Sequence, residues 1–256
     1  MNKDLKEKFA FTLAEGATHV GIFNNTRRVG FTLAEVLITL GIIGIVSAMT
    51  IPTLLNNYRQ KVLDKQFVQT YSLLSQNLLL TQSQYDYIPK CYYGGNGMPT
   101  QRTGCTEFFN IFFNNLKVTK KCANKAFENG CIPEYNGIDD VYEQENPNTI
   151  IPDGYDSYGE YASVGCNYYR KNYIQNNTTV YNLSNGNIIF LYNNGYLPTI
   201  TFDINGHQEP NKWGHDLFSI NISYDGNKFF LNQSTCMKPE DGGTSTEIKL
   251  QQLGLR

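Results

Sequence analysis

The stretch from Phe31 to Leu55 constrains the fold of this chain more than any other part of its sequence. It reads FTLAEVLITLGIIGIVSAMTIPTLL and carries one charged residue, Glu35. A helix of this length and composition can cross a lipid bilayer. Arg27 and Arg28 lie on its amino side, so the positive-inside rule predicts that the preceding residues stay in the cytoplasm. We therefore expect a single membrane pass followed by an exported domain.

Three interpretations fit an apolar stretch at this place in a chain. An ordinary signal peptide would use Arg27 and Arg28 as its basic region and would be cut near Ala48. An uncleaved anchor would leave Glu35 unexplained, because a charge at membrane depth costs about 2.5–3.5 kcal/mol on insertion scales unless it is paired. The third interpretation gives Glu35 a partner, since a cut just before Phe31 would create a cation in the same apolar layer.

The third interpretation is supported by a resemblance. Residues 30–35, Gly-Phe-Thr-Leu-Ala-Glu, resemble the processing motif of type IV prepilins and pseudopilins, in which a glutamate stands at the fifth position after the cut. The resemblance implies that a prepilin peptidase cuts after Gly30 and methylates Phe31. It also implies that Glu35 pairs with the amino terminus of a neighbouring subunit. Gly30 suits cleavage because a residue without a side chain lets the backbone lie extended in a protease cleft.

Two further positions agree with this resemblance. Gly44 and Pro52 occupy places that resemble helix-weakening sites of pilins, since glycine lowers helix propensity and proline removes a backbone hydrogen bond. For Gly41 and Gly44, close helix packing inside a membrane is an open alternative. The segment from Phe11 to Gly16 repeats FTLAE without a following apolar run, and we interpret it as a relic. A duplicated start and a regulatory leader are open alternatives for that segment.

After Pro52 the pattern changes to that of an amphipathic helix. Apolar residues recur at spacings of three and four among polar ones, at Leu63, Phe67, Tyr71, Leu74 and Leu78. Together with the apolar stretch they predict one helix from about Thr32 to Ser83. A helix half in the bilayer and half on a globular head is the architecture of pilins, so the resemblance implies a pilin-like fold. We divide the chain into a leader (1–30), a spanning helix (31–55), an amphipathic helix (56–83) and an exposed head (84–256).

Beyond Asn176 apolar and polar residues alternate, which predicts strands. Five strands are expected, at residues 178–183, 187–192, 197–204, 217–224 and 228–231. Turn residues separate most of them, because Asn and Gly tolerate the positive φ of tight hairpins. We therefore expect the α+β class, with an antiparallel sheet that lays one face on the outer half of the long helix. Between residues 86 and 171 the sequence predicts one helix, Thr106 to Leu116.

All six cysteines follow the apolar stretch, and none belongs to a CxxC pair. In an exported region this pattern favours disulfides over zinc. We expect the shortest loops to close, which would pair Cys91 with Cys105, Cys122 with Cys131, and Cys166 with Cys236. Free buried thiols are the alternative for some of them.

The connection between Phe202 and Phe218 is the most distinctive part of the head. It resembles the late loop of major pseudopilins, where carboxylates and carbonyls hold a calcium ion. The resemblance implies an oxygen ligand set from Asp203, Asn205 and Asp216. A structural turn is the alternative, because Asp and Asn also form turns and no twelve-residue calcium loop is present. The two histidines of this connection lack a nearby third ligand, so we interpret them as surface residues rather than zinc ligands: His207 and His215.

Composition and motifs narrow the function further. No phosphate-binding glycine loop and no GxSxG elbow occur, so we do not expect an enzyme. A formal net charge of -2 without a basic cluster does not suit nucleic acid. The expected function is a structural subunit of a type IV pilus or type II secretion pseudopilus. A filament-displayed adhesin or ligand-binding minor pilin is the alternative.

The resemblance also implies partners and a location. Expected partners are a prepilin peptidase, other pilin or pseudopilin subunits and an inner-membrane assembly platform. We expect no cofactor besides the calcium ion considered above. The chain should sit in the cytoplasmic membrane with its head outside, and later in a filament in the periplasm or on the cell surface.

Overall fold

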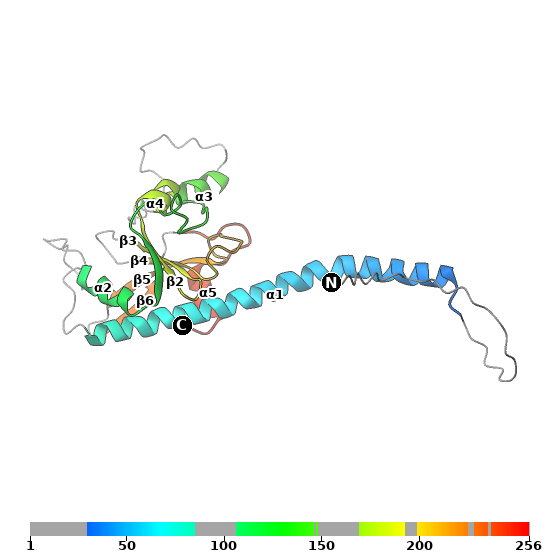
Figure 1. Cartoon of the computed structure of the whole chain (residues 1–256), viewed down its shortest axis with the longest axis horizontal. Coiled ribbons are helices and arrows are strands. Elements are labelled where there is room, and N and C mark those ends of the chain that lie inside the picture. The colour runs from blue at the N-terminus through cyan, green and yellow to red at the C-terminus, as the bar shows by residue number, and fades with distance from the viewer. Residues whose placement is uncertain are drawn as a thin grey trace, which may run out of the picture. The chain divides into compact units, whose positions relative to one another are not determined.

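A computed structural model describes residues 30–84, 106–145, 147, 169–192, 199–224, 228–234 and 237–255 (Figure 1). The chain divides into two compact units between Pro52 and Thr53. The elements of the described residues are α1 (Leu33–Gln84), α2 (Thr106–Asn114), β1 (Val118–Cys122), α3 (Ile138–Glu145), α4 (Lys171–Asn176), β2 (Thr179–Leu183), β3 (Ile188–Tyr192), β4 (Thr199–Asp203), β5 (Leu217–Tyr224), β6 (Phe229–Gln233) and α5 (Thr246–Gln252). They confirm the predicted α+β class and the long amino-terminal helix. The predicted division into leader, spanning helix, amphipathic helix and head stays a prediction.

The first unit contains the apolar part of α1. Its large side chains are exposed, as Leu37 at 61% and Ile45 at 61% illustrate. This helix is long and apolar enough to cross a membrane. A helix that is apolar all round and exposed in the isolated chain needs an apolar environment from outside the chain.

The head contains a six-stranded antiparallel sheet in the order β1-β2-β3-β4-β5-β6, so each strand pairs with the next along the chain. Strands β2 to β6 correspond to the five predicted strands, with ends that differ by at most two residues. Strand β1 was not predicted, because Lys120 and Lys121 interrupt its apolar alternation. Charged side chains suit its position at the edge of the sheet.

One face of the sheet packs on the outer half of α1, as predicted. Phe67 lies at the centre of this contact, with its ring centroid 4.7 Å from that of Phe218 and 5.8 Å from that of Phe202. The short helix α2 adds four buried phenylalanines to the same core. Asn77 of α1 is buried there and donates its side-chain amide to the Phe112 carbonyl at 2.9 Å, which fixes α2 on α1.

A second core covers the other face of the sheet. Helices α3 and α4 lie on the side away from α1 (Figure 1). Strand β3 is buried from both sides, because Ile189 joins the first core while Ile188 and Phe190 join the second. The sequence predicted neither α3 nor α4, since each is shorter than three turns.

One disulfide lies in the second core. Cys122 and Cys131 are bonded, with Cα atoms 6.5 Å apart, which confirms that predicted pairing. The other four cysteines lie outside the described residues, so their pairings stay predictions: Cys91, Cys105, Cys166 and Cys236.

Candidate functional site

The first candidate site is the start of α1, where three hydrogen bonds join Thr32 and Glu35. The Thr32 backbone amide donates to Glu35 Oε2 at 2.8 Å, and the Thr32 hydroxyl donates to the same oxygen at 2.9 Å. In return the Glu35 amide donates to Thr32 Oγ1 at 3.3 Å. This reciprocal pattern is a capping box, which satisfies amide groups that a helix start otherwise leaves unpaired. Glu35 therefore has a structural role inside its own chain.

The capping box uses one oxygen of the Glu35 carboxylate. No hydrogen bond to its other oxygen, Oε1, is found among the described residues. Phe31 directly precedes the cap and is 86% exposed. Glu35 Oε1 therefore keeps its capacity to accept a hydrogen bond.

Gly30 is not required by the fold of its own chain. A Cβ built at Gly30 would meet nothing within 4 Å in the described part of the chain, and its φ is not positive. Sterically, a larger residue would fit this structure. A requirement for glycine here must therefore come from a partner that handles the backbone, as a protease cleft does.

The helix continues through both predicted helix-weakening positions. Gly44 and Pro52 lie inside α1, and the helix shows no break at either. A Cβ at Gly41 or Gly44 would meet nothing within 4 Å among the described residues. Neither glycine is explained by packing within the chain. Their predicted roles, in loosening the helix or in contacts with other helices, stay predictions.

The second candidate site is the loop from Asp203 to Asp216, where two fully buried carboxylates organise the backbone. Asp203 Oδ1 accepts from the amides of Asn205 at 2.9 Å and Gly206 at 2.6 Å. Its Oδ2 accepts from the Tyr135 hydroxyl at 2.7 Å. Gly206 has a positive φ of +69°, and a Cβ there would lie 2.2 Å from the Gly186 carbonyl oxygen. The turn therefore needs glycine.

Asp216 closes the other end of the loop in the same way. Its Oδ2 accepts from the Asn211 amide and its Oδ1 from the Lys212 amide, both at 2.8 Å. The Asn211 side-chain amide can donate to the carbonyls of Gln208 and Gly206, both at 3.1 Å. The loop thus satisfies much of its own polar backbone, as buried polar groups require.

Burial changes the acidity of both carboxyl groups. It raises the pKa of Asp203 well above the ordinary 3.8, and the negative charge of Asp216 raises it further. Burial likewise raises the pKa of Asp216, although the amides of Lys212 and Asn211 oppose this rise. The folded head therefore holds protons at these positions more tightly than the unfolded chain does.

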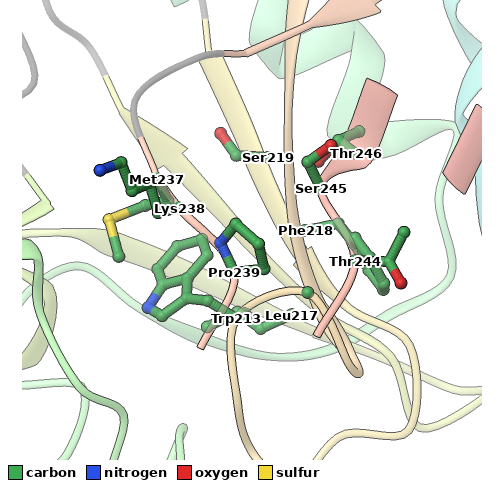
Figure 2. Close-up of a pocket in the computed structure, with 11 residues that line it drawn as sticks. Trp213, Leu217, Phe218, Ser219, Met237, Lys238, Pro239, Thr244, Ser245 and Thr246 are labelled. Carbon is green, nitrogen blue, oxygen red and sulfur yellow. The ribbon is translucent and has the colours of Figure 1, made fainter. Parts of the chain in front are cut away.

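A third buried acid, Glu240, joins the loop to the carboxyl-terminal segment. Its Oε1 accepts from the Trp213 amide at 3.0 Å and its Oε2 from the Asn136 side chain at 2.7 Å. Figure 2 shows Trp213, Met237 and Pro239 around the adjacent void. The void is about 10 Å³, the room of roughly one water molecule, so it is too small for an organic ligand.

The calcium expectation stays a prediction. Three of the four carboxylate oxygens of Asp203 and Asp216 accept from backbone amides and the fourth from a tyrosine, which is the geometry of the structural-turn alternative. Asn205 Oδ1 is buried without a hydrogen-bond partner. No group of three or more His, Cys, Asp or Glu side chains in the described residues could hold a metal ion.

His207 is exposed, and His215 is half-buried with Nε2 3.0 Å from the Asp241 carbonyl.

Sequence reasoning missed three residues of these sites. Thr32 carried a signal, because Thr-x-x-Glu before an apolar run is the pattern of a capping box. Tyr135 and Glu240 carried none, since they reach the loop from 68 and 27 residues away along the chain. Only the folded sheet brings them to the loop.

Comparison with known proteins identifies the amino-terminal region. Residues 27–51 match the prokaryotic N-terminal methylation motif, which is typical of type IV pilins and pseudopilins. No curated protein and no solved structure matches the chain significantly. The matched residues include the Thr32–Glu35 cap and the first part of α1, and they exclude the head.

Proposed function

We propose that this chain is the membrane-anchored precursor of a subunit of a type IV pilus or pseudopilus, which a prepilin peptidase cuts after Gly30 and methylates at Phe31. The observation that carries the proposal is the geometry at Glu35, within a matched methylation motif. One carboxylate oxygen starts the helix, and the other accepts no hydrogen bond among the described residues. Cleavage supplies a cation of the right charge one residue before the cap.

Cleavage after Gly30 and the pairing of Glu35 are physically linked, because cleavage creates the ammonium group with which Glu35 would pair. The mature subunit leaves the bilayer and stacks its apolar helix among those of its neighbours, away from water. A buried carboxylate is tolerated when it is paired, and the new ammonium group of a neighbouring Phe31 is such a partner. Because side chains must align for this pair to form, Glu35 would also set the register between subunits.

The head is the part that a filament would display. Its polar residues maintain the fold, and we assign it no chemical step. A prepilin peptidase, further pilin or pseudopilin subunits and an inner-membrane assembly platform are the partners that this function requires. The head would face outward from the cytoplasmic membrane, consistent with Arg27 and Arg28 on the other side.

Two substitutions distinguish the helix-capping role of Glu35 from the role of its negative charge. Glu35→Gln keeps a side chain that can complete a capping box but removes the carboxylate. The substitution leaves the ammonium group of the neighbouring subunit buried without a charged partner, which should destabilise the assembled filament by about 3–5 kcal/mol. Filament incorporation should then fall more than about tenfold. Thr32→Ala removes the hydroxyl, which makes two of the three hydrogen bonds of the cap, and keeps the charge. Its incorporation should therefore stay close to wild type.

The measurement is the fraction of subunit in sheared filaments, with cleavage scored by mass in the same cells. Both variants should be cut normally. Normal incorporation of Glu35→Gln, or failure of Thr32→Ala alone, would show that the glutamate acts only as a cap. Gly30→Leu is the matched processing control, because the folded chain accepts a side chain there while the peptidase should not.

A further inference from the structure

A groove of about 700 Å³ lies between the first outer turns of α1 and the loop after β4. The helix wall consists of Asn56, Tyr58, Arg59, Gln60, Val62 and Leu63, and the loop wall consists of Gln208, Glu209, Pro210 and His215. Both walls belong to the same compact unit. With this volume the groove can hold a small organic group, unlike the void of about 10 Å³ beside Trp213.

The position of this groove follows from the apolar run. The twenty residues from Val36 to Leu55 would span about 30 Å as a helix, which is the thickness of the hydrocarbon core. The groove begins with the next residue, Asn56. In the anchored precursor it therefore lies at the level of the lipid headgroups. Tyr58, which is 66% exposed, is the kind of residue that marks this level in membrane proteins.

The groove contains both signs of charge. Arg59 on the helix wall supplies a guanidinium group, which binds phosphate oxygens with two parallel hydrogen bonds. Glu209 on the loop wall supplies a carboxylate, which binds an ammonium group. Neither residue takes part in an ion pair found among the described residues, and both side chains are exposed.

We infer that this groove holds the headgroup of a zwitterionic aminophospholipid, with its phosphate on Arg59 and its primary ammonium group on Glu209. The inference rests on the membrane anchoring of the proposed function. Charge complementarity selects this headgroup. Glu209 repels a purely anionic headgroup, and a quaternary ammonium group cannot donate hydrogen bonds to its carboxylate. The contact would hold the head against the membrane until the subunit is extracted.

The test uses the uncleaved full-length chain in vesicles that contain equal amounts of phosphatidylethanolamine, phosphatidylcholine and phosphatidylglycerol. Native mass spectrometry after gentle release should find phosphatidylethanolamine retained in preference to the other two lipids. Arg59→Gln should lower retention of this lipid about tenfold, a loss of about 1.4 kcal/mol. Glu209→Gln should abolish the preference over phosphatidylcholine, because only the ammonium contact distinguishes these two lipids.

Matched control variants remove the same charges outside the groove. Lys61→Gln changes an exposed cation two residues from Arg59, and Glu247→Gln changes an exposed carboxylate on α5. Neither should alter lipid retention. If Lys61→Gln has the effect of Arg59→Gln, diffuse surface charge explains the binding and the inference is wrong. Equal retention of the three lipids by the wild type also overturns it.

A photoreactive residue at Gln208 tests the competing occupant, a second copy of this chain. Adducts with phosphatidylethanolamine support the inference, whereas cross-linked dimers without lipid adducts overturn it. Flotation of the same vesicles separates this inference from the anchoring that it needs. A chain that floats without lipid preference refutes the groove alone, and a chain that does not float refutes the anchoring as well.

Discussion

Glu35 in α1 and Asp203 in the head are both carboxylates that accept hydrogen bonds from their own chain, and they use their oxygens differently. Asp203 is fully buried and accepts from three donors of its own chain. Glu35 is exposed and gives one oxygen to its own cap. Both oxygens of Asp203 are therefore satisfied within the head, whereas Glu35 Oε1 accepts no hydrogen bond among the described residues.

The same contrast holds for apolar residues. Phe67 is fully buried by the sheet, while Ile45 of the same helix is 61% exposed. The fold of the head therefore accounts for Phe67. The apolar side chains in the first part of α1 are exposed among the described residues, which fits a helix that is long and apolar enough to cross a membrane.

The largest expected effect on stability is that of Phe67→Ala. It removes a ring that contacts Phe202 and Phe218, so the free energy of unfolding of the head should fall by about 3–5 kcal/mol. Ile45→Ala, the matched change on the same helix, should leave it unchanged. Chemical denaturation of the detergent-solubilised chain, followed by Trp213 fluorescence, measures both. A similar loss of unfolding free energy in both variants would contradict the contrast between the buried Phe67 and the exposed Ile45.

A smaller loss is expected for Lys249→Ala. Lys249 is buried on α5 and pairs with Asp64 of α1, whose side chain is 39% exposed. Because Asp64 keeps access to water, the loss should be about 1–2 kcal/mol rather than the larger value of a fully buried pair. Lys65→Ala, an exposed neighbour of Asp64, is the control and should change little. Equal effects would mean that the ion pair does not fix α5.

The buried acids of the head predict that its stability depends on pH. The raised pKa of Asp203 means that the folded state keeps this proton above pH 3.8 while the unfolded state loses it. The free energy of unfolding should therefore fall as the pH rises through the folded pKa. Asp203→Asn cannot ionise, so the wild type should lose stability relative to this variant over that window. If the difference in unfolding free energy between wild type and Asp203→Asn is the same at every pH, the pH dependence does not come from Asp203.

The smallest expected effect is that of calcium, which separates the two interpretations of the Asp203–Asp216 loop. If the loop is a structural turn, saturating calcium should leave the thermal midpoint of the head unchanged. A bound ion would instead raise it with concentration, since a ligand of the folded state stabilises it. Such a rise, absent in Asp216→Asn, would favour the calcium site.

The sequence predicted the long helix, five of the six strands and one of the disulfides, because these follow local periodicity and spacing. Strand β1 was not predicted, because its two lysines hide the apolar alternation of a strand. Its place at the edge of the sheet depends on its pairing with β2, which the sequence does not show. The contacts of Asp203 with Tyr135, and of Glu240 with Trp213, depend on distant segments. At Glu35 the sequence identified the unusual charge, and the structure added the cap with Thr32.

The mass of the mature amino-terminal peptide shows directly whether the chain is cut after Gly30. The chain should be isolated from a cell that contains a prepilin peptidase and digested, and its amino-terminal peptide should then be sequenced by mass spectrometry. Our account predicts a peptide that begins with N-methylated Phe31. An intact Met1 would contradict cleavage, and a terminus near Met49 would instead identify an ordinary signal peptide.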